Sequence, residues 1–354
     1  MKALIAMSGG VDSSVSAYIL KRDGYDCSGI MMLLCPGSDL SSDEEMTGRA
    51  SAVCRKMDIP FEAVELRDEF RSTVIEDFIS SYISGITPNP CIICNKYMKF
   101  GRLMDIASKR GFDRFATGHY ARVIRNEDTG LMELHKAKDP SKDQTYVLYN
   151  MNQEVLSRVL FPLGDLTKAE VRKIAAEAGF ENASSKESQD ICFIPDGDYA
   201  AFLGRNASSL PPEGNFVTED GKILGTHKGI TNYTIGQRKG LGISSDAPLF
   251  VIKIRPETNE VVLSHGEGLF MDRLHLRNVN WISGMIPEAP VRAAVKVRYK
   301  HQEQPASITV TGSDTAMVVF EEAVRAPTPG QSAVFYDGDN VLGGGVICSD
   351  GGNT

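Results

Sequence analysis

The sequence predicts an α/β + β protein, with an N-terminal parallel-sheet domain, a small central β-rich domain and a C-terminal β-barrel. The first half of the chain alternates short apolar runs with amphipathic stretches of helical period. Helical periodicity ends near residue 200, and beyond it Gly and Pro separate short segments of alternating apolar and polar residues. We therefore expect domains at residues 1–200, 201–270 and 271–354.

The N-terminal elements follow in order from residue 3. An apolar run at 3–7 predicts a strand, a helix begins near Ser13, and residues 29–34 predict a second strand. Ser42, with Glu45 three residues on, has the spacing that opens a helix. Because strands and helices alternate in this way, we expect a parallel sheet covered by helices.

Later elements are predicted from their periodicity. Apolar residues keep helical spacing in three further stretches, at 70–83, 100–107 and 169–178. In the C-terminal region, alternating residues predict barrel strands at 291–299, 307–310, 316–321, 332–336 and 341–347. In the first of these strands the polar face carries Arg292, Lys296 and Arg298, which predicts either a basic nucleic-acid surface or an ordinary solvated strand face.

Composition excludes several classes of protein. The 354 residues carry 38 Lys and Arg against 46 Asp and Glu, a net charge of -8, which disfavours non-specific nucleic-acid binding but allows a local basic groove. No apolar run approaches the ~20 residues of a membrane span, and the apolar N-terminal run is too short for a signal peptide. We expect a cytoplasmic protein. Seven scattered cysteines do not suggest a disulfide framework.

Residues 8–14 form the most specific local motif, a Ser-Gly-Gly-Val-Asp-Ser-Ser loop between a strand and a helix. Two glycines let a backbone approach an anion, while serine hydroxyls and the helix N-terminus donate hydrogen bonds. Asp12 could help hold Mg²⁺ on the phosphates. The alternative is a Gly-Ser turn in which Asp12 only caps the helix. The loop matches neither a Walker loop nor a dinucleotide-binding motif.

Cysteines form the second candidate site. Cys94, in Asn-Pro-Cys-Ile-Ile-Cys-Asn at 89–95, precedes a predicted helix, and a thiol near a helix N-terminus is shifted toward thiolate. Cys192 is its candidate partner. A single C-x-x-C is equally compatible with half a zinc site. We interpret Cys27, Cys54 and Cys348 as buried small hydrophobes and leave Cys35 undecided.

Taken together, the motifs resemble one family, the tRNA-specific 2-thiouridylases, in the ATP pyrophosphatase (PP-loop) superfamily. The resemblance runs almost from end to end. Besides residues 8–14, it rests on the segments 117–122, 142–146, 162–164, 233–242, 298–302, 329–331 and 342–345. It implies that ATP adenylates the C2 oxygen of the wobble uridine in the tRNAs for Lys, Glu and Gln, and that sulfur then replaces AMP.

The resemblance also implies roles for individual residues. ATP would be held by Ala6, Met7, Ser8, Gly9, Gly10, Val11, Asp12, Ser13, Met32 and Gly118. The target base would face Asn89, Pro90 and Cys91. The tRNA would contact His119, Lys142, Asp143, Gln144, Arg298, Tyr299 and Gln331. Cys94 would carry a persulfide supplied by a cysteine desulfurase or a sulfur-carrier protein, and Cys192 would resolve it.

Cys91 departs from the family pattern, in which many members carry Asp at this position. Cys91, Cys94 and Cys192 could instead hold a 4Fe-4S cluster through three thiolates, leaving one iron open for sulfide. The motif leaves persulfide relay and cluster equally open. Two other functions compete: another PP-loop synthetase that adenylates a small carboxylate or carbonyl substrate, and a non-catalytic RNA-binding protein.

Overall fold

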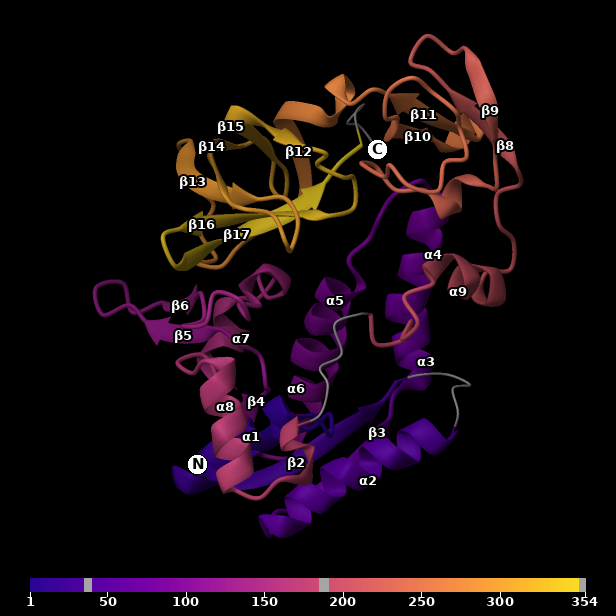
Figure 1. Ribbon diagram of the computed structural model, residues 1–354. Coiled ribbons are helices and arrows are strands. Elements are labelled where there is room, and N and C mark those ends of the chain that lie inside the picture. Colours follow the sequence, from indigo (N-terminus) through magenta and orange to yellow (C-terminus); the bar gives the residue numbers. More distant parts are fainter. Residues whose placement is uncertain (35–39, 185–190, 350–354) are drawn as a thin grey trace.

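The computed structural model describes residues 1–34, 40–184 and 191–349. Figure 1 shows three parts: the N-terminal domain at the bottom, the barrel at the upper left and the central domain at the upper right. The predicted fold class, a parallel-sheet domain followed by β-rich domains, is confirmed. Within the described ranges, no helix is both long and apolar enough to cross a membrane.

A five-stranded parallel sheet forms the centre of the N-terminal domain, in the order β3-β2-β1-β4-β7. Its strands are β1 (Lys2–Ala6), β2 (Asp26–Leu33), β3 (Phe61–Glu65), β4 (Arg114–Ala116) and β7 (Val159–Leu160). Successive side chains point to opposite faces of a strand, so Leu4 and Ile5 are both buried but belong to different cores. Both faces of the sheet are therefore covered, as the predicted alternation requires.

Helices pack on the two faces. The Ile5 core includes residues of α1 (Val11–Arg22), α2 (Leu40–Lys56) and α8 (Lys168–Glu177). The Leu4 core includes residues of α3 (Arg67–Phe70), α4 (Glu76–Ile83), α5 (Pro90–Ile93), α6 (Met104–Lys109), α7 (Gln153–Arg158) and α9 (Tyr199–Asn206). A π-helical segment, Cys94–Leu103, joins α5 to α6. The predicted helix start after Ser42 is wrong by two residues, because α2 already begins at Leu40.

The central domain contains a four-stranded sheet in the order β10-β11-β8-β9. The strands are β8 (Gly214–Val217), β9 (Ile223–His227), β10 (Phe250–Arg255) and β11 (Glu260–Ser264). Their buried face carries Phe216, Val251 and Val261, which pack against Ile230 and Tyr233 from the connecting segment. This small core holds the long connection between β9 and β10 against the sheet.

Six antiparallel strands close the C-terminal barrel in the order β12-β15-β14-β13-β16-β17, with β12 also paired to β17. They are β12 (Phe270–Trp281), β13 (Val291–Lys296), β14 (Gln304–Val310), β15 (Ala316–Arg325), β16 (Ser332–Asp337) and β17 (Asn340–Ile347). Five were predicted. The strand that closes the barrel, β12, was missed, although its Leu274 and Leu276 alternate and face the core.

A hairpin from the N-terminal domain extends this barrel sheet. β5 (Arg122–Arg125) and β6 (Met132–His135) pair with each other, and β6 pairs with β17 through Val341↔Leu134. The N-terminal domain and the barrel thus share one continuous sheet, and this pairing fixes their relative position. The sequence did not predict this contact, because its partners are more than 200 residues apart.

Candidate active site

The phosphate loop, residues 8–14, follows β1 and continues into the first turn of α1, and its serine hydroxyls form hydrogen bonds within it. The Ser13 hydroxyl accepts a hydrogen bond from the Ser8 N–H at 3.2 Å and donates to the Gly10 carbonyl at 3.0 Å. Gly9 has φ +73°, and a Cβ there would lie 2.9 Å from the Met46 carbonyl oxygen. Gly10 is the N-cap residue of α1, so the alternative in which Asp12 caps the helix is wrong. The backbone N–H groups of this end remain suited to an anion.

Asp12 is paired with Lys168. The Lys168 ammonium lies 2.8 Å from each carboxylate oxygen of Asp12, and the Tyr120 hydroxyl donates to the same carboxylate at 2.8 Å. Lys168 is only 8% exposed. The predicted site therefore contains a buried cation beside the loop, and the Asp12 carboxylate is held by that cation in this structure.

Lys168 was missed by the sequence reasoning, although the sequence carries a signal for it. It is the first residue of α8, directly after the Thr167 cap that forms a capping box with Glu170. The N-terminus of a helix repels cations. A lysine at this position that is also buried needs a carboxylate partner, and here that partner is Asp12.

Gly118 lies against the loop from the adjacent strand. It follows β4, which pairs with β1, and the parallel register brings the carboxyl ends of both strands to one edge of the sheet. A Cβ on Gly118 would lie 2.9 Å from the Asp12 carbonyl carbon and the Ser13 nitrogen. Met32 comes from the neighbouring strand β2 and is half-buried. These nucleotide-site candidates share one edge of the sheet.

The second candidate site is the helix that begins at Pro90. Asn89 caps it by accepting a hydrogen bond from the Cys91 N–H at 3.2 Å. Cys91 is exposed, whereas Cys94, one turn further on, is buried within the Leu4 core. Burial raises the pKa of the Cys94 thiol, and the charge of Lys99 lowers it in part. The expected shift toward thiolate is thus wrong for this conformation, because Cys94 packs in the core rather than at the exposed helix end.

Lys99 connects the two sites. In a π-helical segment residues five apart share a face, which places Lys99 on the side of Cys94. Its ammonium lies 3.4 Å from His119 Nε2. His119 follows Gly118 directly. The charge of Lys99 therefore acts on the Cys94 thiol, and its ammonium contacts His119, the neighbour of the glycine that packs on the phosphate loop.

His119 is buried and uncharged. Burial and the charge of Lys99 lower its pKa well below the ordinary histidine value. Because an ammonium can only donate, Nε2 accepts from Lys99, and Nδ1 then donates to the Thr117 hydroxyl at 2.7 Å. The ring lies inside the protein, between Phe100 and Phe161, and the residue is 7% exposed.

Cys192 is exposed and lies beside Phe193. Phe193 packs against Phe70 and Phe78, with ring centroids 5.6 and 5.5 Å apart, in the same core as Cys94. In the part of the chain that the structure describes, no three His, Cys, Asp or Glu side chains form a group that could hold a metal ion. The three candidate cluster thiols are described, so their arrangement here does not fit an iron-sulfur cluster. Cys27 and Cys54 are buried, as predicted, while Cys348 is half-buried and Cys35 lies outside the described residues.

Several residues that were predicted to contact tRNA also form hydrogen bonds within the protein. Asp143 accepts from the Ala137 N–H and the Thr145 hydroxyl, and Gln144 accepts from the Tyr120 N–H. Lys142, the first residue of this segment, is half-buried. The Tyr299 hydroxyl donates to the Asp143 carbonyl at 3.2 Å, while the Tyr299 ring is 36% exposed.

Tyr299 connects the segment 142–144 with the helix that begins at Pro90, which we call the cysteine helix. The charge of the Cys91 thiolate form contributes to the raised pKa of Tyr299, after the larger effect of burial. Tyr299 of the barrel thus contacts Asp143 of the N-terminal domain and lies within electrostatic range of Cys91.

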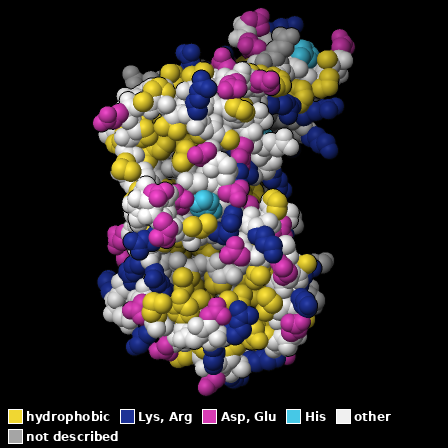
Figure 2. Space-filling view, turned by 90° about the vertical axis from the view of Figure 1, so that its left-hand side faces the viewer, with side chains coloured by type: hydrophobic (Ala, Val, Ile, Leu, Met, Phe, Trp, Pro, Cys, Tyr) yellow, Lys and Arg dark blue, Asp and Glu magenta, His cyan; other side chains and the backbone are white. Residues whose placement is uncertain are grey.

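Arg298 corrects the prediction of a basic strand face. It follows β13 and is partly buried, donating to the Ile235 carbonyl at 3.1 Å, the Ala326 carbonyl at 2.6 Å and the Thr328 hydroxyl. Its Nε is buried and has no hydrogen-bond partner. Arg298 therefore joins the barrel to the central domain. On the face shown in Figure 2, acidic and basic side chains are interspersed, with several Lys and Arg side chains on the upper lobe.

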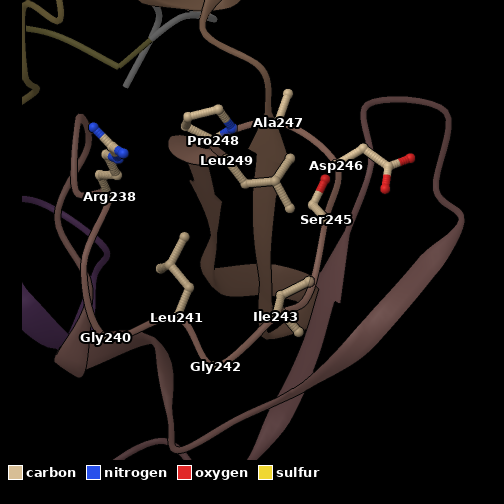
Figure 3. Close-up of a pocket in the computed structure, with 10 residues that line it drawn as sticks. All are labelled: Arg238, Gly240, Leu241, Gly242, Ile243, Ser245, Asp246, Ala247, Pro248 and Leu249. Atoms are coloured by element: carbon tan, nitrogen blue, oxygen red, sulfur yellow. The ribbon is translucent and has the colours of Figure 1, made fainter.

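A cavity of about 390 Å³ lies in the central domain, away from both candidate sites. Figure 3 shows Leu241, Ile243 and Leu249 around it, with Arg238 and Asp246 on opposite sides. Arg238, a candidate phosphate contact, lines it, but none of the residues predicted to hold ATP, the target base or the sulfur does. The cavity therefore does not change the assignment of the candidate active site.

Comparison with known proteins matches the whole chain. Family models match in order: the tRNA methyl transferase HUP domain over residues 1–196, the tRNA methyl transferase PRC-barrel domain over 200–265 and the aminomethyltransferase beta-barrel domain over 271–347. The chain is 47% identical over 352 residues to the tRNA-specific 2-thiouridylase MnmA of Clostridioides difficile, covering 98% of each chain. It is 46% identical over 350 residues to the tRNA-specific 2-thiouridylase MnmA 2 of Clostridium botulinum, covering 97% of each.

Among solved structures, the U34-tRNA thiolase NcsA from Methanococcus maripaludis, with its 4Fe-4S cluster, matches at a TM-score of 0.35 and 16% identity. That match covers 59% of this chain and 67% of the other.

Proposed function

Because this chain belongs to the family of tRNA-specific 2-thiouridylases, we propose how its residues carry out the ATP-dependent thiolation of a tRNA uridine. Family membership makes the chain a tRNA sulfurtransferase. The two competing functions, a small-molecule synthetase and a non-catalytic RNA-binding protein, are therefore wrong. The substrates we propose are the tRNAs for Lys, Glu and Gln, with the wobble uridine as the target, in the cytoplasm.

The phosphate loop binds the phosphates of ATP. Its backbone N–H groups at the N-terminus of α1 lie at the carboxyl edge of the sheet, where Lys168 adds a positive charge. Asp12 and Lys168 neutralise each other before ATP binds. The Asp12 carboxylate would hold Mg²⁺, which when bound would supply positive charge to the leaving pyrophosphate, and the Lys168 ammonium beside it would add to that charge. The uridine C2 oxygen attacks the α-phosphate and becomes adenylated.

Cys94 carries the sulfur. A cysteine desulfurase or a sulfur-carrier protein supplies a persulfide to its thiol. The terminal sulfur of the persulfide attacks C2 of the adenylated base and AMP leaves with the C2 oxygen. The Cys192 thiolate then attacks the Cys94 sulfur, so that a Cys94–Cys192 disulfide forms and the transferred sulfur remains on the base as the thiocarbonyl. An external dithiol reduces the disulfide for the next cycle.

Persulfide relay is favoured over a cluster because the three candidate thiols do not form a metal-holding group in this conformation. Cys91 is exposed at the start of the helix and lies within electrostatic range of Tyr299 of the barrel. We therefore place the flipped base against residues 89–91, with Tyr299 beside it. A wobble base is single-stranded, so its extrusion into such a site costs little.

A single observation carries this proposal: Lys99 lies beside Cys94 and contacts His119, which follows the glycine packed on the phosphate loop. This arrangement supports the proposal that the thiol and the ATP site are parts of one active site. The test measures 2-thiouridine in glutamate tRNA by nucleoside mass spectrometry. We expect Cys94→Ser and Cys192→Ser to lose the product and Cys348→Ser, a matched control outside the site, to retain it. Product formation by Cys94→Ser would overturn the proposal.

A further inference from the structure

The segment 84–89, which we call the strap, joins α4 to α5 and leads into the cysteine helix. It leaves α4 beside the central domain and descends to α5 (Figure 1). Gly85 has φ +68°, and a Cβ there would lie 2.9 Å from Ile254 and from Pro256 of the central domain. One end of the strap is therefore packed closely on the central domain.

The other end of the strap is held by the barrel. The turn 329–331, which precedes β16, accepts a hydrogen bond from the Thr87 N–H at the Pro329 carbonyl, at 3.0 Å. The Gln331 side-chain amide donates to the Thr87 carbonyl at 2.9 Å and to the Pro88 carbonyl at 3.2 Å. Three hydrogen bonds thus connect two strap residues to this barrel turn.

The turn itself is fixed within the barrel and fits tightly against the strap. The Gly330 N–H donates to the Ile347 carbonyl at 2.9 Å, and the Ile347 N–H donates to the Gln331 carbonyl at 2.8 Å. Gly330 has φ +89°, and a Cβ there would lie 2.9 Å from the Thr87 carbonyl oxygen. Because the turn is fixed in the barrel and packs closely on the strap, the position of the turn determines the position of the strap.

The strap ends at the residue that starts the cysteine helix. Asn89, directly after Pro88, provides the cap that accepts from the Cys91 N–H. The backbone of residues 87–88 determines the position of the Asn89 cap. The cap in turn determines the position of the first helical turn, which contains Cys91 and is followed by Cys94. Gln331 is suited to this function because a neutral amide has two N–H groups and can donate to two carbonyls at once.

We propose that Gln331 is a positioning residue for sulfur transfer, which holds the strap so that the helix presents Cys94 to the adenylated base. The resemblance to 2-thiouridylases implied a different role for it, contact with tRNA. The inference rests on the proposed function of Cys94, and it gives the C-terminal barrel a part in the chemistry of the N-terminal domain.

The test uses the full chain with Gln331→Ala, Gln331→Glu and the matched control Gln302→Ala, an exposed glutamine of the barrel domain. Three quantities are measured: the Kd for tRNA, the single-turnover rate of 2-thiouridine formation from protein already carrying the persulfide, and the rate of Cys94 alkylation by iodoacetamide, followed by peptide mass spectrometry. Thermal unfolding identifies any variant that does not fold.

We expect Gln331→Ala to slow thiolation about tenfold and to speed Cys94 alkylation by a similar factor, since two hydrogen bonds that order the strap are lost. Thiolation by Gln331→Glu should be slower still, because a carboxylate cannot donate a hydrogen bond and repels the carbonyls of Thr87 and Pro88. The tRNA Kd should change less than twofold, as in Gln302→Ala.

A loss of tRNA affinity that matches the loss of thiolation, with Cys94 alkylation unchanged, would overturn the inference and leave Gln331 as a tRNA contact. If Gln331→Ala does not fold, the same comparison is made with Gln331→Glu and with Gln331→Met, which keeps the side-chain length. The alkylation measurement does not depend on sulfur transfer. A failure of the proposed function, seen as product formation by Cys94→Ser, is therefore distinguishable from a failure of the strap inference.

Discussion

Lys168 and Asp12 form the closest ion pair of the candidate active site, with the ammonium 2.8 Å from both carboxylate oxygens. Their backbones are 156 residues apart in the sequence. The pair explains why Asp12 can lie in an anion-binding loop before ATP is present: the lysine neutralises a carboxylate that would otherwise repel phosphate. It also makes Lys168 the residue to which the ATP-dependent step should be most sensitive.

Lys168→Met should lower kcat/KM for ATP about 100-fold or more, because it removes a preorganised positive charge from the pyrophosphate that leaves. The measurement is tRNA-dependent pyrophosphate release. Lys173→Met is the matched control, since Lys173 is exposed on the same helix and faces Glu177. An equal decrease of kcat/KM in the two variants would contradict a specific role of the Lys168 charge at the phosphate loop.

Gly118→Ala should weaken ATP binding and lower the free energy of unfolding by roughly 1–3 kcal/mol, because its Cβ would press on the backbone of the phosphate loop. Isothermal titration with a non-hydrolysable ATP analogue and urea unfolding test both effects. Gly48→Ala is the control, since nothing lies within 4 Å of a Cβ at that helical position. If Gly118→Ala bound the ATP analogue as tightly as the wild type, Gly118 would not be part of the nucleotide site.

Lys99→Met should shift the alkylation of Cys94 to higher pH. Burial already raises the pKa of this thiol and Lys99 opposes that effect, so removing the cation raises the pKa further. At about pH 8 the alkylation and thiolation rates should both fall, by about three- to tenfold. Lys96→Met, at an exposed position of the same helix, should leave the pH profile in place. A profile shifted to lower pH would contradict the role of Lys99.

Cys91→Ser distinguishes the two sulfur-transfer mechanisms. Under persulfide relay the variant should keep thiolation within a few-fold of the wild type, because Cys94 and Cys192 remain. If a cluster carries the sulfur, the variant should lose both iron and product. The measurement pairs iron content after anaerobic reconstitution with 2-thiouridine yield. Cys94→Ser and Cys192→Ser do not separate the mechanisms, since both should abolish activity under either one.

Local sequence was sufficient to predict the phosphate loop and the start of the cysteine helix. Residues 8–14 are contiguous, and their geometry follows from glycine conformation and serine hydroxyls within one turn. The fold class was predictable for a similar reason, because the periodicity of each element reports which of its faces are buried.

Long-range contacts account for what the sequence did not predict. Lys168 was missed because its partner lies on another helix, and Lys99 because only a π-helical segment brings it beside Cys94. Arg298 was expected on the polar face of a strand, either at a nucleic-acid surface or in solvent, but it is partly buried and donates to the Ile235 carbonyl of the central domain. Burial decides the pKa of Cys94, and burial depends on how the whole Leu4 core packs.

The most direct test of the account is 2-thiouridine formation by iron-free protein. Unmodified glutamate tRNA is given ATP, Mg²⁺, a cysteine desulfurase with cysteine, a dithiol reductant and protein stripped of iron, and the nucleosides are analysed by mass spectrometry. The account predicts the thiolated base under these conditions, with a persulfide on Cys94 as the source of sulfur. Product that forms only after anaerobic reconstitution with iron and sulfide would contradict it and assign the sulfur to a cluster on Cys91, Cys94 and Cys192.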